Sequence, residues 1–93
     1  MEVVLLQSAQ ADLMEIYARH GEASYHAVDA SLESIRQMPE LAPIYSGRFR
    51  RKVVERSPFG VFYTITGERL MVSFVMDLRQ DPKVIAERIR KGS

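Results

Sequence analysis

The sequence predicts an α+β fold: an antiparallel β-sheet of about four strands, an N-terminal helical hairpin packed on one face, and a short C-terminal helix. Three patterns support this prediction. Apolar residues recur at helical spacing between positions 9 and 35, interrupted by a glycine. Two apolar runs flank Gly67 and Glu68, as the strands of a β-hairpin would. Asp81 and Pro82 then mark the start of a last helix. The 93 residues suffice for one domain, residues 1–93.

The N-terminal part predicts a strand and two helices. Residues 2–6 are a short, β-branched apolar run typical of a strand. Ser8 is expected to cap the first helix, because its hydroxyl can accept from free backbone N–H groups. Gly21 is expected to end this helix, and Pro39 forbids continuation of the second. The apolar stripes that would face the sheet are Ala9, Leu13, Ile16 and Tyr17, then Tyr25, Val28, Leu32 and Ile35.

The β-hairpin has a defined expected register. Glycine at the first central position of a two-residue turn is the signature of a type II′ turn. Side chains alternate along strands, so this turn would place eight apolar residues on one face, which we expect to be the core. The expected pairs are Ile65 with Leu70, Tyr63 with Val72, Val61 with Phe74, and Phe59 with Met76. Methionines are expected to fill the core, namely Met14, Met38, Met71 and Met76.

A basic strand precedes the hairpin. Residues 48–56 carry five cations and one acid, although the whole chain has a net charge of only +1. Burial of unpaired cations is costly, so we expect a bulge or a longer turn that moves Phe49 and Val53 inward. Arg48, Arg50 and Lys52 would then project together. In the last helix, the expected apolar side consists of Val84, Ile85 and Ile89.

The composition excludes several classes of protein. Without cysteine the chain has neither disulfides nor thiolate metal sites, which fits a reducing compartment. There is no run of about 18 apolar residues and no charged-then-apolar leader. We therefore expect a cytoplasmic protein that contacts no membrane. No motif indicates a cofactor, and two histidines without cysteine predict no metal site.

Several segments resemble the RelE/ParE superfamily of bacterial toxins. Residues 11–16 (ADLMEI) are similar to its first-helix motif, and residues 48–56 followed by PFGVFY at 58–63 are similar to its central pattern. Residues 75–82 (VMDLRQDP) resemble its closing strand and turn. The resemblance covers nearly the whole chain. It implies the growth-inhibiting toxin of a type II toxin–antitoxin system of the plasmid-stabilisation kind, neutralised by a cognate antitoxin with which it can form a hetero-oligomer.

The resemblance leaves two activities open. RelE-like members are endoribonucleases that cut messenger RNA on the ribosome, whereas ParE-like members poison DNA gyrase without chemistry of their own. The ribonuclease reading implies Arg51, Lys52 and Arg79 as catalytic residues. The arginine that such enzymes carry after the first aromatic of the next strand aligns with Gly60, and their helical tyrosine aligns with Ile85. We therefore favour ParE-like gyrase inhibition, and a binding module without toxicity is a third possibility.

Two sets of residues are candidates for contacts with the target or the antitoxin. Cations along one strand can follow phosphates or an acidic segment, which nominates Arg48, Arg50 and Arg56. The alternative is an edge strand whose cations prevent aggregation. For the antitoxin, we expect a groove between helical hairpin and sheet, with exposed apolar side chains at Leu13, Ile16 and Leu32.

Overall fold

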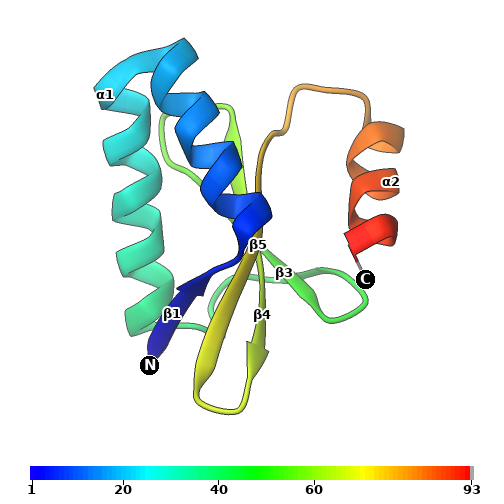
Figure 1. The fold of residues 1–93 in the computed structure, drawn as a ribbon. Helices are drawn as coiled ribbons and strands as arrows, with labels where there is room; N and C mark the ends of the chain where they lie inside the picture. Colours follow the sequence, from blue (N-terminus) through cyan, green and yellow to red (C-terminus); the bar gives the residue numbers. More distant parts are fainter. Residues whose placement is uncertain (93) are drawn as a thin grey trace.

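The computed structural model describes residues 1–92 and has three layers (Figure 1). A sheet lies in the middle, the long helical element α1 covers one face, and the short helix α2 covers the other. The elements are β1 (Glu2–Leu5), α1 (Gln7–Gln37), β2 (Ile44–Ser46), β3 (Phe49–Val53), β4 (Phe59–Thr66), β5 (Arg69–Asp77) and α2 (Pro82–Gly92).

The predicted α+β class is confirmed, but the sheet is mixed and has five strands in the order β1-β5-β4-β3-β2. β1 pairs in parallel with β5, whereas the other three pairs are antiparallel. A strand that joins the sheet through a long helical connection is free to pair in parallel, because no tight turn reverses its direction. The fifth strand is β2, which lies in the segment expected to be a loop.

The helical hairpin is present within α1. Gly21 has φ 83° and ψ −172°, a backbone geometry outside the helical region, and divides α1 into two segments. The prediction that Ser8 caps the first segment is wrong. Leu6 occupies the N-cap position, and the Ser8 hydroxyl donates instead to the backbone oxygen of Ser73 at 2.6 Å. None of the helices within residues 1–92 combines the length and apolar character needed to cross a membrane.

A β-bulge changes which residues share a face. Tyr63 pairs with Val72 as expected, but Phe62 pairs with Phe74, so Ser73 is an extra residue on β5. Beyond the bulge, every side chain of β5 faces the side opposite to the expected one. Phe74 and Met76 therefore pack under α2, and the prediction that they share a face with Val61 is wrong. The other six predicted residues of that face do lie on the α1 side.

The result is a core on each face of the sheet. The core under α1 includes Tyr63, whose side chain is fully buried and whose hydroxyl donates to the backbone oxygen of Pro39 at 2.6 Å. Burial raises the pKa of Tyr63 above its ordinary value, so the neutral phenol is retained as a donor. The core under α2 contains Phe49, Phe62, Phe74, Met76, Ile85 and Ile89.

The chain between β5 and α2 begins the last helix as predicted. The Asp81 carboxylate accepts from the N–H of Lys83 at 2.8 Å, and Pro82 is the first residue of α2. Ile85 and Ile89 are buried, but Val84 is 52% exposed, so its assignment to the apolar side is wrong.

Candidate functional site

The basic strand β3 turns its cations to both faces of the sheet. Arg50 pairs with Tyr63 and Lys52 with Val61, so these two cations lie on the α1 side. Arg51 pairs with Phe62 and lies on the α2 side. Arg50 is half-buried and donates to the backbone oxygens of residues 40 and 42 at 3.0 and 2.8 Å. The expected row of three projecting cations is therefore not formed, because Arg50 folds onto the neighbouring loop.

The prediction that Phe49 and Val53 replace Arg50 and Lys52 on the apolar face of the hairpin is wrong. Phe49 is buried, but under α2, whereas Val53 is 50% exposed and Val54 is buried in the core under α1. The Val54 N–H donates to the backbone oxygen of Phe59 at 2.9 Å, which closes a turn of four residues. A turn of four residues differs from a two-residue turn by an even number. Each side chain of β3 therefore faces the same side of the sheet in both cases, and Arg50 and Lys52 stay on an apolar face.

The candidate ribonuclease residues Arg51 and Lys52 line a common hollow at the edge of β3 although they lie on opposite sides of the sheet, and Arg79 does not line that hollow. Arg51 stacks over the Tyr45 ring at 4.6 Å on the α2 side, whereas Lys52 lies on the α1 side. Arg79 forms an ion pair with Asp77 at 2.7 Å, and its hydrogen bonds lower the pKa of that carboxyl below the ordinary value.

Gly60, the position for which the resemblance implies an arginine in RelE-like enzymes, is covered. A Cβ atom at Gly60 would lie only 2.9 Å from the side chain of Leu78, which packs over it. The aligned position in α2, Ile85, is buried in the core and carries no group able to transfer a proton.

Positive charge without a carboxylate partner is concentrated on β3 and on the residues that flank it. Among residues 1–92, none of the five cations at positions 48–56 has a carboxylate oxygen within 4.0 Å. The same holds for Lys83, whereas the remaining lysines and arginines are paired. The paired cations are Arg19, Arg36, Arg69, Arg79, Arg88, Arg90 and Lys91.

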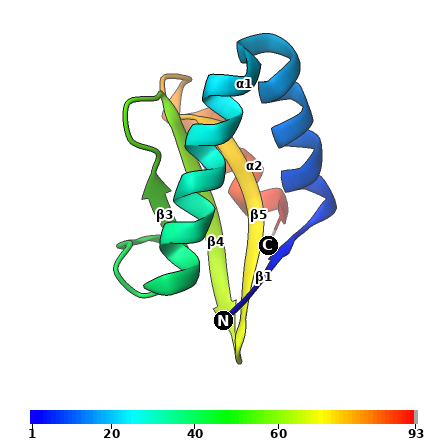
Figure 2. The same cartoon turned by 90° about the vertical axis from the view of Figure 1, so that its left-hand side faces the viewer.

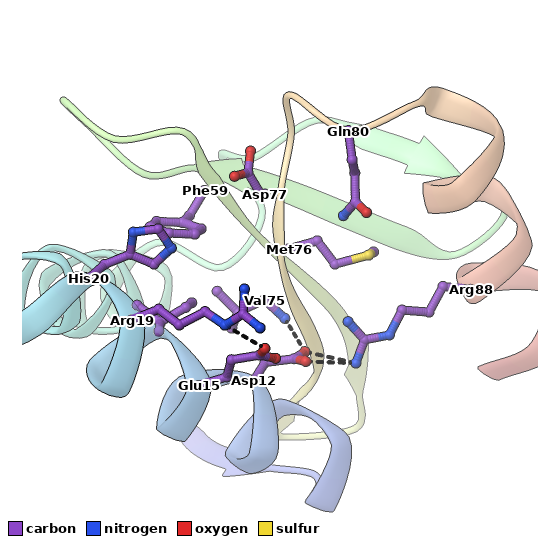
Figure 3. Close-up of a pocket in the computed structure, with 11 residues that line it drawn as sticks. Asp12, Glu15, Arg19, His20, Phe59, Val75, Met76, Asp77, Gln80 and Arg88 are labelled. Atoms are coloured by element: carbon purple, nitrogen blue, oxygen red, sulfur yellow. Dashed lines mark hydrogen bonds and ion pairs between the residues drawn. The ribbon is translucent and has the colours of Figure 1, made fainter.

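A polar cleft of about 350 Å³ lies between the first segment of α1, β5 and α2 (Figure 3). Its carboxylates are engaged by arginines: Asp12 by Arg88 at 2.8 Å and Glu15 by Arg19 at 3.1 Å. Asp12 also accepts from the backbone N–H of Val75 at 2.9 Å. His20 packs against the ring of Phe59, with 5.2 Å between ring centroids, in the same cleft. This cleft is an ion-paired junction between three elements rather than an acid–base site.

An apolar groove runs along the outer side of the helical hairpin and is called the hairpin groove below. It has a volume of about 750 Å³ and is lined by Leu5, Gln10, Leu13, Met14, Tyr17, Ala18 and Tyr25. Met14 is 74% exposed, and the rings of Tyr17 and Tyr25 meet edge to face at 5.8 Å. The prediction that Met14, Tyr17 and Tyr25 pack in the core is wrong. They form a second apolar stripe beside the buried one. The sequence shows this as an apolar face wider than one row of helical positions.

The residues expected to be exposed for the antitoxin are buried instead. Leu13, Ile16 and Leu32 are 8%, 5% and 9% exposed and belong to the core under α1. They point to the sheet because they are the apolar stripe that the helices need to attach to it. Only Leu13 also reaches the hairpin groove, at its floor.

Solved structures from a toxin–antitoxin system and of a toxin share this fold. A chain of the chromosomal ParDE TA system from P. aeruginosa matches with a TM-score of 0.66 at 20% identity, over 85% of this chain and 97% of that chain. A copper-bound mutant toxin from Helicobacter pylori matches with a TM-score of 0.65 at 15% identity, over 83% of this chain and 93% of that one. No family profile matches the sequence, and no curated protein matches it either. The chain thus has the fold of the ParE/RelE-type toxins.

Proposed function

We propose that this protein is the toxin of a type II toxin–antitoxin system that acts in the cytoplasm, in the ParE manner, by inhibiting DNA gyrase. The observation that carries the proposal is the shared fold with the ParDE chain, which extends over most of both chains. Inhibition of this kind needs a binding surface and no catalytic group. The unpaired cations of β3 and the exposed hairpin groove are two surfaces suited to protein partners.

The arrangement of side chains supports a binding mechanism over RNA cleavage. Cleavage requires a base for the 2′-hydroxyl, cations around the phosphate and an acid for the leaving oxygen. All of these groups must lie within a few ångströms of the phosphate that is cleaved. Arg51 and Lys52 diverge, and Leu78 covers the backbone at Gly60. The ribosome-dependent endoribonuclease remains the second candidate, because the unpaired cations of β3 would also attract the phosphates of RNA.

Induced expression in a bacterium separates the candidates. We expect a DNA-damage response before protein synthesis falls, and we expect the purified protein to block supercoiling of a relaxed plasmid by gyrase. The measurement follows supercoiling and translation side by side. Early translational arrest with messages cut within codons would instead establish the ribonuclease, with Arg51→Ala and Arg79→Ala as the variants that should abolish cutting. Absence of both effects would leave a binding module without toxicity.

We propose further that the cognate antitoxin covers the hairpin groove. Exposed large apolar side chains such as Met14 and Tyr17 are costly in water and are typical anchors of protein interfaces. The groove lies beside β1, an outer strand of the sheet, so an antitoxin segment there would contact both helix and sheet.

A single charge at the groove should weaken the complex. We expect Met14→Asp to reduce affinity for the protein encoded by the adjacent reading frame by about tenfold or more, because a carboxylate would be buried among apolar groups. The matched control is Ala23→Asp, an exposed position of α1 outside the groove, which should bind as the wild type does. Calorimetric titration measures both. Equal affinities for the two variants would exclude the hairpin groove as the docking site.

A further inference from the structure

The outer edge of β3 is only partly covered. Its pairing with β2 involves Phe49 and Arg50, and the N–H of Arg51 donates to the backbone oxygen of Pro43 at 3.1 Å. Backbone groups alternate between the two edges of a strand, so the N–H and C=O of Val53 point the same way as those of Arg51. Within residues 1–92, no strand or loop pairs with these two groups of Val53. The edge therefore offers main-chain hydrogen bonds to another chain.

β3 lies beside the second segment of α1 (Figure 2), and a groove between them follows this open edge. We call it the β3-edge groove. It consists of two adjoining hollows of about 260 and 530 Å³ that share Ser34 and Lys52. The helix side is formed by small residues, which allow another backbone to approach closely. These are Ala27, Ala30, Ser31 and Ser34.

Apolar side chains stand exposed at one end of the β3-edge groove. Met38, Leu41 and Val53 are 55%, 71% and 50% exposed and line the smaller hollow. Alternate residues of an added strand would point towards them, as side chains do on one face of a strand. The sequence-based assignment of Met38 to the core is wrong at this point, and the exposed side chain is part of the groove instead.

The charge along the β3-edge groove is predominantly positive. Lys52 and Arg56 line the larger hollow and Arg51 the smaller one, and these cations have no carboxylate partner within residues 1–92. Glu55 is the one carboxylate among the lining residues of the two hollows. A partner that carries carboxylates would be complementary to these cations, which favours its association over that of a basic partner.

We propose that the β3-edge groove binds an extended, acidic segment of a partner protein, which adds to the sheet as a further strand beside Val53. Addition of a strand uses main-chain hydrogen bonds for affinity and side-chain contacts for specificity. A nucleic acid would use the cations but not the free main-chain groups or the apolar end of the groove. The inference goes beyond the proposed function, because it concerns a different surface from the hairpin groove and holds for any target of the protein.

A designed peptide tests the chemistry of the site on the complete purified chain. The probe is a fluorescein-labelled peptide of about ten residues in which glutamate alternates with valine, a pattern that favours an extended strand. Fluorescence anisotropy should show binding in the micromolar range, and a peptide with lysine in place of glutamate should bind at least about tenfold more weakly. No binding of the acidic peptide at about 1 mM would overturn the proposal. Stronger binding of a single-stranded oligonucleotide that displaces the peptide would assign the surface to nucleic acid instead.

Three variants locate the binding. Lys52→Glu should lower the affinity for the acidic peptide by about tenfold. Lys83→Glu, which reverses the charge of the unpaired cation on α2, should change that affinity by no more than about twofold. Val53→Pro removes a free donor without removing a bond to β4, and it should weaken the acidic peptide by about fivefold or more. Ala30→Tyr should block the groove from the helix side. Equal losses in Lys52→Glu and Lys83→Glu, or full binding by Val53→Pro, would show that the peptide is held by charge alone and would overturn strand addition.

Discussion

Phe62→Ala should lower the free energy of unfolding by about 3–5 kcal/mol, the largest effect we expect from a single substitution in this chain. The Phe62 side chain is fully buried in the centre of β4 and belongs to the core that α2 covers. Its removal would leave a cavity between the sheet and α2, which neighbouring side chains held by the sheet cannot fill. Urea unfolding followed by circular dichroism measures the difference.

The control for Phe62 is the aromatic residue that packs against its ring from outside. Tyr45 meets Phe62 edge to face with centroids 5.4 Å apart but is 37% exposed. Tyr45→Ala should therefore cost clearly less, about 1–2 kcal/mol, since more than a third of its surface already contacts water. If both variants lost the same stability, α2 would not enclose a core of its own, and the two-faced packing of the sheet would be incorrect.

Asp12→Ala should destabilise the protein by about 2–3 kcal/mol, because it leaves two donors without an acceptor. The Asp12 carboxylate is 13% exposed and accepts from Arg88 at 2.8 and 2.9 Å and from the backbone N–H of Val75 at 2.9 Å. It thereby connects α1, β5 and α2, as Figure 3 shows. Thermal unfolding should show the loss as a fall in Tm of about 10 °C or more for a chain of this size.

Two neighbouring variants separate this role from general charge effects. Asp12→Asn retains an oxygen for the N–H of Val75 and should lose only about half as much stability. Glu15→Ala breaks an ion pair whose side chains are 62% and 73% exposed, so it should change stability by about 0.5 kcal/mol or less. A loss in Glu15→Ala as large as that in Asp12→Ala would contradict the assignment of Asp12 as the connecting residue.

Local patterns predicted the elements of this fold well. The apolar periodicity located both segments of α1, and Gly21 marked the break between them. The turn at Gly67 has φ 60°, while Glu68 keeps an ordinary φ, as a type II′ turn requires. Asp81 was correctly identified as the cap of the last helix. Each of these features depends on residues within one or two turns of one another, and a sequence displays such relationships directly.

Features that depend on distant residues were missed. At the bulge, the backbone of Ser73 accepts from Ser8 and that of Val75 donates to Asp12, and both partners lie about 65 residues away in the chain. One extra residue in β5 moved Phe74 to the other face. The sequence analysis also assigned Met14 to the core, and the exposure of this residue became visible only in the folded chain.

The candidate site also has features that the sequence predicts and features that only the folded chain shows. The sequence alone determined that positive charge gathers in residues 48–56. Only the tertiary structure decided which side of the sheet each cation takes, that Arg50 is bound by backbone carbonyls, and that the edge at Val53 stays open. The physical reason is that charge and side-chain chemistry belong to the residue itself. The face, partner and exposure of a residue are set by register and packing across the whole sheet.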